Sequence, residues 1–256
     1  MIKRTDVGRI QYPQGLSLSD RRHCRRMIVA VAENLKQCDC AIVSCSAGID
    51  STVLAHAAGQ AICIQPQNEA GRVTKVTAVY LNHLLRPNEV SKEVEHVEKL
   101  SQEYLSYVTP AITLDVKKGV GLQERARDAR YEALELLVKK LQTEESQTVH
   151  IMTAHNSNDD AETKIFQFLK GKRALGISPI QNFRSLERVF LTRPFLKFSR
   201  EDIERYAKAF QLSWCEDSSN ETDAYTRNKI RHHLIPWIEE NINPGVVKTL
   251  SRGVVE

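Results

Sequence analysis

Short apolar runs recur along the chain, separated by longer segments in which the apolar residues are spaced differently. Most of the runs are rich in β-branched or aromatic residues, the composition that a pleated surface favours. They predict strands at residues 40–44, 76–83, 107–115, 149–155 and 189–195. The Gln-, Asn- and Gly-rich residues 64–75 predict a loop between the first two strand regions.

The intervening segments follow the 3.6-residue period of amphipathic helices. Residues 27–35 predict one helix, after an irregular start over residues 1–20. Ser199 is placed to cap a helix that begins just after it. Apolar stripes predict three further helices, through Val90, Val94, Val97 and Leu100; through Leu122, Ala126, Ala129, Ala133 and Leu137; and through Ile203, Tyr206, Ala207 and Phe210.

The alternation of strands and helices predicts an α/β fold, a Rossmann-like and mostly parallel sheet flanked by helices. We expect an N-terminal helical lead-in over 1–39, a main α/β domain over 40–215 and a short helical C-terminal tail over 216–256. Ligands of such sheets bind beyond the carboxyl ends of the strands. Residues 46–51, 82–87 and 154–162 each follow a predicted strand, so they should line one edge.

Composition narrows the class of protein without identifying a function. The 256 residues are 41% apolar and 27% charged, as in ordinary globular proteins, and the net charge of +4 does not by itself indicate nucleic acid. Basic clusters at 20–26, 170–173 and 227–233 are, taken singly, typical of solvated surface. The six cysteines form no CxxC pair, and no apolar run approaches membrane-spanning length. We therefore expect a reduced, cytoplasmic protein without a membrane partner.

The stretch "SCSAGIDST" (44–52) joins the first predicted strand to a helix through small residues. The amides at a helix N-terminus and the positive end of its dipole favour anions. Gly48 permits close approach to a ligand, and Ser46 and Ser51 add hydroxyl donors. Asp50 would repel a bare phosphate, so it indicates Mg²⁺, a ribose or a substrate amine. The alternative is an N-capped turn after a buried strand; the sequence lacks a Walker phosphate loop.

Charged pairs further along the chain have both a functional and a structural interpretation. Asp159 and Glu162 lie three residues apart at a helix start and could orient Mg²⁺ or accept a proton from an amine, or simply suit the helix dipole. Arg127 and Arg130 share a helix face that would suit phosphates, or solvent alone.

Two histidines and a basic segment complete the candidate residues. His83 and His155 follow strands and are better interpreted as hydrogen-bonded structural residues than as acids or bases. The basic residues from 227 to 233 have no acid among them, which favours an RNA-facing surface. They are Arg227, Lys229, Arg231, His232 and His233.

Six blocks together resemble a known family. "SAGIDS" resembles the Ser-Gly-Gly-x-Asp-Ser pyrophosphate loop of the ATP pyrophosphatases, the PP-loop enzymes. The other five are similar to segments of tRNA(Ile)-lysidine synthetases: "YLNHLLR", "ERARDARYEAL", "TAHNSNDDAET", "RPF" with "SREDIERYA", and "WCEDSSN" with "TRNKIRHHLIP". The blocks cover roughly residues 40–236 in the family's order, and six in register are far more specific than one.

The resemblance implies an adenine nucleotide alpha-hydrolase-like PP-loop fold and an ATP-dependent ligase that uses Mg²⁺. Its substrates would be free L-lysine and the wobble cytidine of tRNA(Ile) with a CAU anticodon. Asp50, Asp159 and Arg227 would be catalytic, with Asp50 also a Mg²⁺ ligand. The loop Ser46, Ala47, Gly48, Ile49, Asp50 and Ser51 would bind ATP and pyrophosphate. Substrate, tRNA or phosphate contacts would come from Arg127, Arg130, Glu162, Asn228, Lys229 and Arg231.

The chain departs from the family pattern at two positions. Ala47 stands where the first glycine of the loop is usual, and it strains the loop if its φ is positive. Asn158 replaces the first aspartate of the family's pair. These departures support one alternative, a non-catalytic nucleotide- or RNA-binding relative. A second alternative, a PP-loop tRNA thiolation enzyme, has the same loop but commonly uses paired cysteines, and this chain has no CxxC; an amidating synthetase shares only the loop. The oligomeric state, including a homodimer, is left open.

Overall fold

The structure, a computed structural model, describes residues 8–72, 74–82, 90–114, 122–141, 147–171, 183–186, 189–216 and 226–251. Its strands are β1 (Cys40–Cys45), β2 (Lys75–Asn82), β3 (Ile112–Thr113), β4 (Val149–Met152), β5 (Phe183–Leu186) and β6 (Val189–Thr192). The larger helices are α1 (Leu18–Leu35), α2 (Ile49–Ile64), α3 (Val90–Tyr104), α4 (Leu122–Leu141), α5 (Ser157–Leu169) and α6 (Arg200–Phe210). The tail comprises α7 (Thr226–Lys229), the π-helical turn η3 (Ile230–Leu234), α8 (Ile235–Asn241) and α9 (Val246–Ser251).

Within these residues six strands form one sheet in the order β3-β2-β1-β4-β6-β5. Every neighbouring pair is parallel except β5 with β6, so the predicted α/β class and mostly parallel sheet are confirmed. The chain leaves β1 toward β2 on one side and later returns to β4 on the other. A sheet binds ligands in the crevice at such a switch point, beyond the carboxyl ends of β1 and β4.

Some predicted elements have different bounds in the structure. Within the described part of the strand predicted over 107–115, residues 107–114, only Ile112–Thr113 is a strand, and Pro110 has no amide hydrogen to give to a strand ladder. The first helix begins at Leu18 instead of residue 27, with the Ser17 side chain accepting a hydrogen bond from the Asp20 amide. The edge strand β5 was not predicted at all. Ser199 caps α6 as expected.

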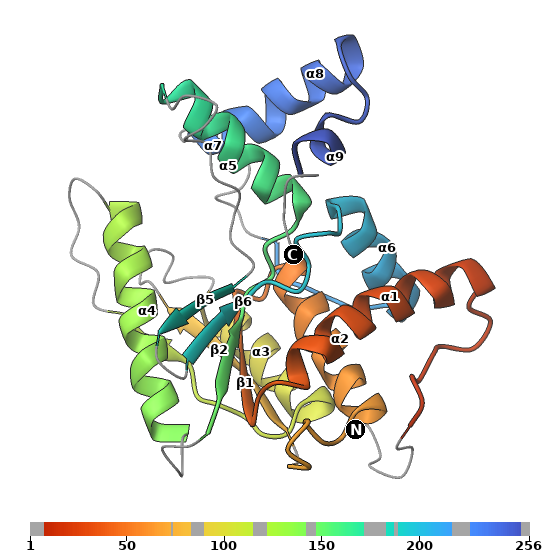
Figure 1. The fold of residues 1–256 in the computed structure, drawn as a ribbon, viewed down its shortest axis with the longest axis vertical. Coiled ribbons are helices and arrows are strands. Elements are labelled where there is room, and N and C mark those ends of the chain that lie inside the picture. Colours follow the sequence, from red (N-terminus) through yellow and green to blue (C-terminus); the bar gives the residue numbers. More distant parts are fainter. Residues whose placement is uncertain are drawn as a thin grey trace.

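Helices cover both faces of the sheet and form separate cores (Figure 1). On one face α1, α2, α3 and α6 pack in a single cluster around the fully buried Val43, Leu54 and Tyr206. On the other face α4 packs Leu134 and Val138 against β1, β2, β4 and β6. Helix α2 is buried along most of its length, and this fixes the loop that precedes it.

The tail folds back on α5 at the end of the sheet (Figure 1). Ala161 of α5 shares a small apolar core with residues of η3, α8 and α9. Buried Asp160 pairs with Lys164 at 2.8 Å, and Lys164 also donates to the Leu250 carbonyl oxygen of α9. The proposed domain limits at 39/40 and 215/216 stay predictions. None of the helices in the described ranges is long and apolar enough to cross a membrane.

Buried His56 makes the stability of this core depend on pH. Its Nδ1 lies 2.9 Å from the Tyr206 hydroxyl, and burial lowers its pKa from 6.5 to about 3. The unfolded chain therefore takes up this proton below pH 6.5 and the folded chain does not, so stability falls as pH falls. Between pH 6.5 and 5 we expect His56 to remove about 1.6 kcal/mol of unfolding free energy. Denaturant titrations of the wild type and His56→Leu at both pH values test this; an equal pH dependence in both would contradict it.

Candidate active site at the carboxyl ends of β1 and β4

The loop between β1 and α2 is braced from within by one hydroxyl group. Ser51 Oγ accepts a hydrogen bond from the Ser46 amide (3.1 Å) and donates one to the Gly48 carbonyl oxygen (3.0 Å). Gly48 is the N-cap of α2, so the amides of the first helical turn have no acceptor within the helix. The loop thus has the donors of an anion site, while the Ser51 hydroxyl is used in holding its shape.

Ala47, not Gly48, has the unusual backbone conformation in this loop. Its φ is 63°, in the left-handed region, whereas Gly48 has an ordinary φ of −70°. The Ala47 carbonyl oxygen accepts from the Cys215 amide at 3.0 Å, and its side chain is fully buried. Ala47, which stands where the family usually has glycine, therefore has a positive φ, and the loop is strained at this position.

Replacing Ala47 with glycine should tighten ATP or pyrophosphate binding with little change in stability. A left-handed alanine costs about 1–2 kcal/mol. The variant also loses a buried methyl group, about 0.8 kcal/mol, and gains unfolded-state freedom, about 0.5–1 kcal/mol. These opposing effects nearly cancel in the unfolding free energy. Calorimetric titration with ATP and the thermal midpoints measure both quantities; weaker ATP binding would contradict the expected relief of strain.

Asp50 lies in the first turn of α2 with two partners from distant elements. Arg200, the first residue of α6, donates to its Oδ2 at 2.7 Å, and the Asn156 side-chain amide donates to its Oδ1 at 3.2 Å. Burial raises the pKa of Asp50, an effect that the Arg200 charge opposes. Arg200 also contacts Glu204 at 3.0 Å. The carboxylate is therefore fixed between α5 and α6.

Asn156 ties the start of α5 to the loop. Its side-chain oxygen caps α5 by accepting from the amides of Asn158 and Asp159, and the Asp159 carboxylate accepts the Asn156 amide hydrogen in return. Asn158 in turn accepts from the Arg200 amide at 3.0 Å. The Asn158 amide oxygen thus supports the start of α6, and a carboxylate oxygen could accept the same bond.

Arg231 makes the tightest ion pair of the site. Its guanidinium donates to both oxygens of Glu162 (2.6 and 3.0 Å) and to Asp159 (3.1 Å). Burial raises the pKa of Glu162, and the positive charge of Arg231 opposes this effect. Burial alone would lower the pKa of Arg231, but its interactions with Glu162 and Asp159 outweigh burial and raise it. Arg231 lies in the π-helical η3, which precedes Pro236, and a proline disturbs the helical turn before it.

Replacing Arg231 with alanine should destabilise the fold by about 1–2 kcal/mol: the buried Glu162 carboxylate loses its partner, but the Arg231 side chain is 42% exposed and water screens the pair. Lys229→Ala, two residues before Arg231 and exposed, is the matched control and should stay within about 0.5 kcal/mol. The raised pKa of Glu162 gives the sign of the pH effect: protonation neutralises the group, so the loss should be smaller at pH 5 than at pH 8. Urea unfolding at both pH values measures it; an equal loss at the two would exclude the Glu162 charge as its cause.

Arg227 reaches the same helix one turn beyond Asp159. It donates to the Thr163 hydroxyl at 2.5 Å, and that hydroxyl donates to the Asp159 carbonyl oxygen at 2.8 Å. Lys229 is exposed on the same short helix, and Asn228 is half-buried there. The roles of Asn228, Lys229 and Arg231 as RNA contacts stay predictions, although Arg231 is already held by carboxylates.

His155 lies among basic side chains and is neutral at physiological pH. Burial lowers its pKa to about 4, although Asp159 acts in the opposite direction. The charges of Arg193, Arg227 and Arg130 also lower this pKa. The Nδ1 atom of His155 lies 2.9 Å from the Thr153 hydroxyl. These contacts agree with the interpretation of His155 as a structural residue.

The donor atoms of the site suit Mg²⁺ together with phosphates. Mg²⁺ takes oxygen ligands and is commonly held by one or two carboxylates plus substrate phosphates. Asp50 and Asp159 are near enough for the charge of Asp159 to raise the pKa of Asp50. The described residues include no group of three His, Cys, Asp or Glu side chains that could hold a metal without a substrate. The N-terminus of α2 suits a phosphate group. ATP as the ligand of the loop and Asp50 as a Mg²⁺ ligand stay predictions.

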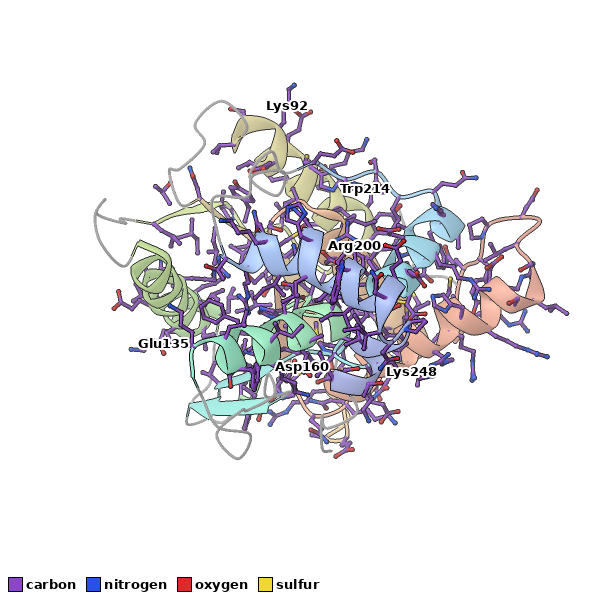
Figure 2. The ribbon with its side chains drawn as sticks, turned by 90° about the horizontal axis from the view of Figure 1, so that it is seen from above. Lys92, Glu135, Asp160, Arg200, Trp214 and Lys248 are labelled. Carbon is purple, nitrogen blue, oxygen red and sulfur yellow. The ribbon has the colours of Figure 1, made fainter. Side chains whose placement is uncertain are left out.

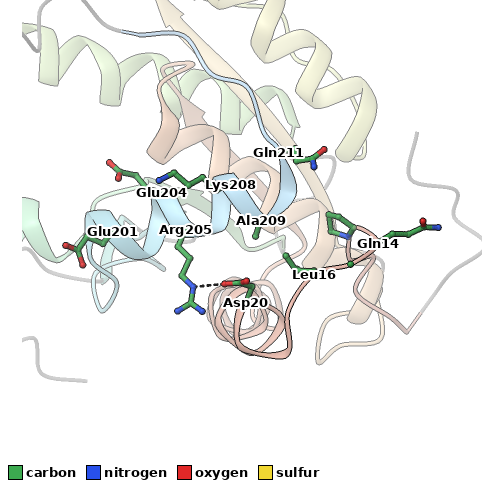
Figure 3. A pocket seen from close by; sticks show the side chains of 11 residues that line it. Gln14, Leu16, Asp20, Glu201, Glu204, Arg205, Lys208, Ala209 and Gln211 are labelled. Atoms are coloured by element: carbon green, nitrogen blue, oxygen red, sulfur yellow. Dashed lines mark hydrogen bonds and ion pairs between the residues drawn. The ribbon is translucent and has the colours of Figure 1, made fainter.

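A cavity of about 570 Å³ lies beside the site, between α6 and the segment before α1 (Figure 3). None of the predicted site residues lines it. Glu204 does line it, and Glu204 contacts Arg200, the ion-pair partner of Asp50. Its other lining residues are Pro13, Gln14, Gly15, Leu16, Asp20, Glu201, Arg205, Lys208, Ala209 and Gln211.

The fold brings together most of the residues singled out from the sequence. Asp50, Asp159, Glu162, Arg227 and Arg231 come from α2, α5, α7 and η3 and form one network. The side chain of Arg127, and all of His83 and the other residues between 83 and 89, lie outside the described residues.

Sequence analysis missed two members of the site, Asn156 and Arg200. Figure 2 shows Arg200 near the middle of the molecule, in a view that also labels Asp160 of α5. An Asn three residues before an Asp is the signature of a helix cap, so Asn156 could have been found. Arg200 follows the capping Ser199, but nothing in its own segment indicates Asp50 as its partner.

Comparisons with known proteins indicate a family for this chain. The family described as PP-loop domain matches residues 20–238. The chain is 32% identical over 219 residues to a tRNA(Ile)-lysidine synthase of Legionella pneumophila (strain Paris), an alignment that covers 85% of this chain and 46% of the relative. A tRNA(Ile)-lysidine synthase of Clostridium perfringens is 32% identical over 89% of this chain and 47% of its own length. The chain therefore spans about half the length of these curated relatives.

Two solved structures share the fold at low sequence identity. The U34-tRNA thiolase NcsA from Methanococcus maripaludis, described with its [4Fe-4S] cluster, has a TM-score of 0.67 and 14% identity over 91% of this chain and 76% of its own. An NAD+ synthetase from Burkholderia pseudomallei has a TM-score of 0.51 and 11% identity over 93% of this chain and 91% of its own.

Proposed function

The chain belongs to the PP-loop domain family, and we propose that it ligates lysine to the wobble cytidine of tRNA(Ile) with a CAU anticodon. One observation carries the proposal. Asp50 of the PP loop is joined through Asn156 to the start of α5, where Asp159 lies. The loop that we assign to an ATP phosphate and the Asp159 carboxylate that we assign to proton transfer thus share one edge of the sheet. The curated relatives named tRNA(Ile)-lysidine synthase support the choice of substrate.

The first step activates a poor leaving group, the 2-carbonyl oxygen of cytosine. That oxygen attacks the α-phosphorus of ATP and pyrophosphate departs. The loop amides and the dipole of α2 would stabilise the pyrophosphate as its charge develops. Asp50 would hold Mg²⁺, which supplies positive charge against the phosphate oxygens when it is bound.

The second step forms the carbon–nitrogen bond. The ε-amine of lysine attacks carbon 2 of the adenylated cytosine, and AMP leaves with the former carbonyl oxygen. Free lysine is protonated at neutral pH, since the reference pKa is about 10.4. The Asp159 carboxylate would accept the proton that the amine loses, and Arg227, one helical turn away, would contact the nucleotide.

The proposed tRNA substrate sets two conditions, one on the conformation of the RNA and one on the cell compartment. The target base must leave the stack of the anticodon loop, which single-stranded RNA permits. A reaction on tRNA with free lysine and ATP would take place in the cytoplasm.

The decisive experiment is transfer of radiolabelled lysine to tRNA(Ile) with a CAU anticodon, with ATP and Mg²⁺. Cysteine and ammonia serve as competing nucleophiles, and release of AMP and pyrophosphate is measured in parallel. We expect lysine incorporation with one AMP per product. Sulfur transfer instead would indicate a thiolation enzyme, and ATP binding without pyrophosphate release would indicate a non-catalytic relative; either result would overturn the proposal.

A further inference from the structure

Helix α1 presents an arginine-rich face, formed by Arg21, Arg22, Arg25 and Arg26, that the candidate site does not include. All four residues are exposed. The opposite side of α1 is buried through His23, Cys24, Met27, Ile28, Val31, Ala32 and Leu35. With about 3.6 residues per turn, the four arginines occupy one arc of the helix surface. The protein therefore displays four positive charges within two helical turns.

The four arginines have no carboxylate partner among the described residues. Asp20, the acid next to them in sequence, pairs instead with Arg205 of α6 at 2.8 Å. Arg21 lies over the ring of Tyr12 (5.7 Å) and Arg26 over that of Phe198 (5.8 Å), contacts that leave the guanidinium charge uncompensated. Like charges four residues apart destabilise a helix, and this face contains two such pairs. Binding a polyanion would relieve the repulsion among these four arginines.

The arginine-rich face leads toward the candidate site because α1 runs alongside α6. Arg205 contacts Asp20, His23 contacts Asp202, and Arg26 lies over Phe198. Later residues of α1 therefore contact earlier residues of α6, so the two helices run in opposite directions. Arg200, which holds Asp50, is at the start of α6. The Phe198 carbonyl oxygen accepts from the Ser157 amide, at the first residue of α5 and two positions before Asp159. Figure 1 shows α1 and α6 side by side.

We propose that this arginine-rich face of α1 binds the phosphate backbone of the tRNA whose base reacts at the site. The proposal rests on the proposed function for the identity of the RNA. Arginine suits phosphates because its planar fork can donate two hydrogen bonds at once. The four side chains make no base-specific contact in this role, so they would fix the position of the RNA and leave base recognition to the site.

The test compares Arg22→Gln/Arg25→Gln with Lys139→Gln/Lys140→Gln. The control pair is also exposed and removes the same charge from the last turn of α4, on the other face of the sheet. tRNA affinity is measured from 0.05 to 0.5 M salt. If each arginine contacts one phosphate, the first variant should lower the slope of log affinity against log salt by about 1.4–1.8. Its affinity at about 0.1 M salt should fall at least tenfold, and the control should match the wild type.

Lysine transfer at saturating tRNA gives a second readout. Its rate should not change in Arg22→Gln/Arg25→Gln, because these residues do not touch the reacting atoms. Wild-type affinity and slope in that variant, or an equal loss in the α4 control, would overturn the proposal. So would loss of binding to phosphatidylglycerol vesicles with tRNA affinity unchanged, which would assign the face to a membrane surface. If the wild type transfers no lysine, the proposed function fails, while the affinity comparison still decides whether α1 binds RNA.

Discussion

Replacing Asp50 with asparagine is expected to lower ATP-dependent adenylation at least about a hundredfold while the protein stays folded. The new side chain has the same shape and can still accept the hydrogen bond from Asn156. It has no charge with which to hold Mg²⁺ and orient the phosphates of ATP. Pyrophosphate release under single-turnover conditions measures the loss, and near-wild-type release by a folded variant would contradict the assignment.

A control must separate the charge of Asp50 from its ion pair with Arg200, because Asp50→Asn removes both. Arg200→Gln breaks the same pair but keeps the carboxylate. If the carboxylate itself acts on the phosphates, Arg200→Gln should retain far more adenylation than Asp50→Asn. Equal losses in the two variants would mean that the ion pair, and with it the position of α6, is what the reaction requires.

Replacing Arg227 with alanine is expected to slow lysine transfer about a hundredfold, even when tRNA is saturating. Arg227 is exposed and held against α5 by the Thr163 hydroxyl, so its removal should leave the fold intact. If the guanidinium stabilises charge on the reacting nucleotide, the loss appears in the chemical step and not in tRNA affinity. Single-turnover transfer of labelled lysine over a range of tRNA concentrations measures the two separately.

Lys229→Ala provides the comparison for Arg227, since it removes one positive charge from the same short helix. We expect it to weaken tRNA binding and to lower the salt slope by about 0.7–0.9, with normal transfer at saturation. A normal rate for Arg227→Ala at saturating tRNA would reduce Arg227 to the same electrostatic role. Binding of ATP should be unchanged in both variants.

The pattern of strands and helices along the chain is enough to predict the class of fold and the edge at which the site lies. Alternating strands and helices require a mostly parallel sheet, and parallel strands present their carboxyl ends on one side. The loop after β1 and the acidic start of α5 therefore had to lie on one edge, and they meet there because the structure places β1 and β4 next to each other. Short local patterns are also enough to predict helix caps, as with Ser199 at the start of α6 and Asn156 at the start of α5.

Which groups pair within that site follows from tertiary packing. Arg200 is 150 residues from Asp50, and Arg231 is 69 residues from Glu162. No local pattern encodes such partners, because they depend on how α6 and η3 pack against α2 and α5. The same is true of Ala47: its positive φ follows from the path that the loop must take between a buried strand and a buried helix. A sequence specifies these contacts only through the packing of the whole chain, so residue spacing alone could not predict them.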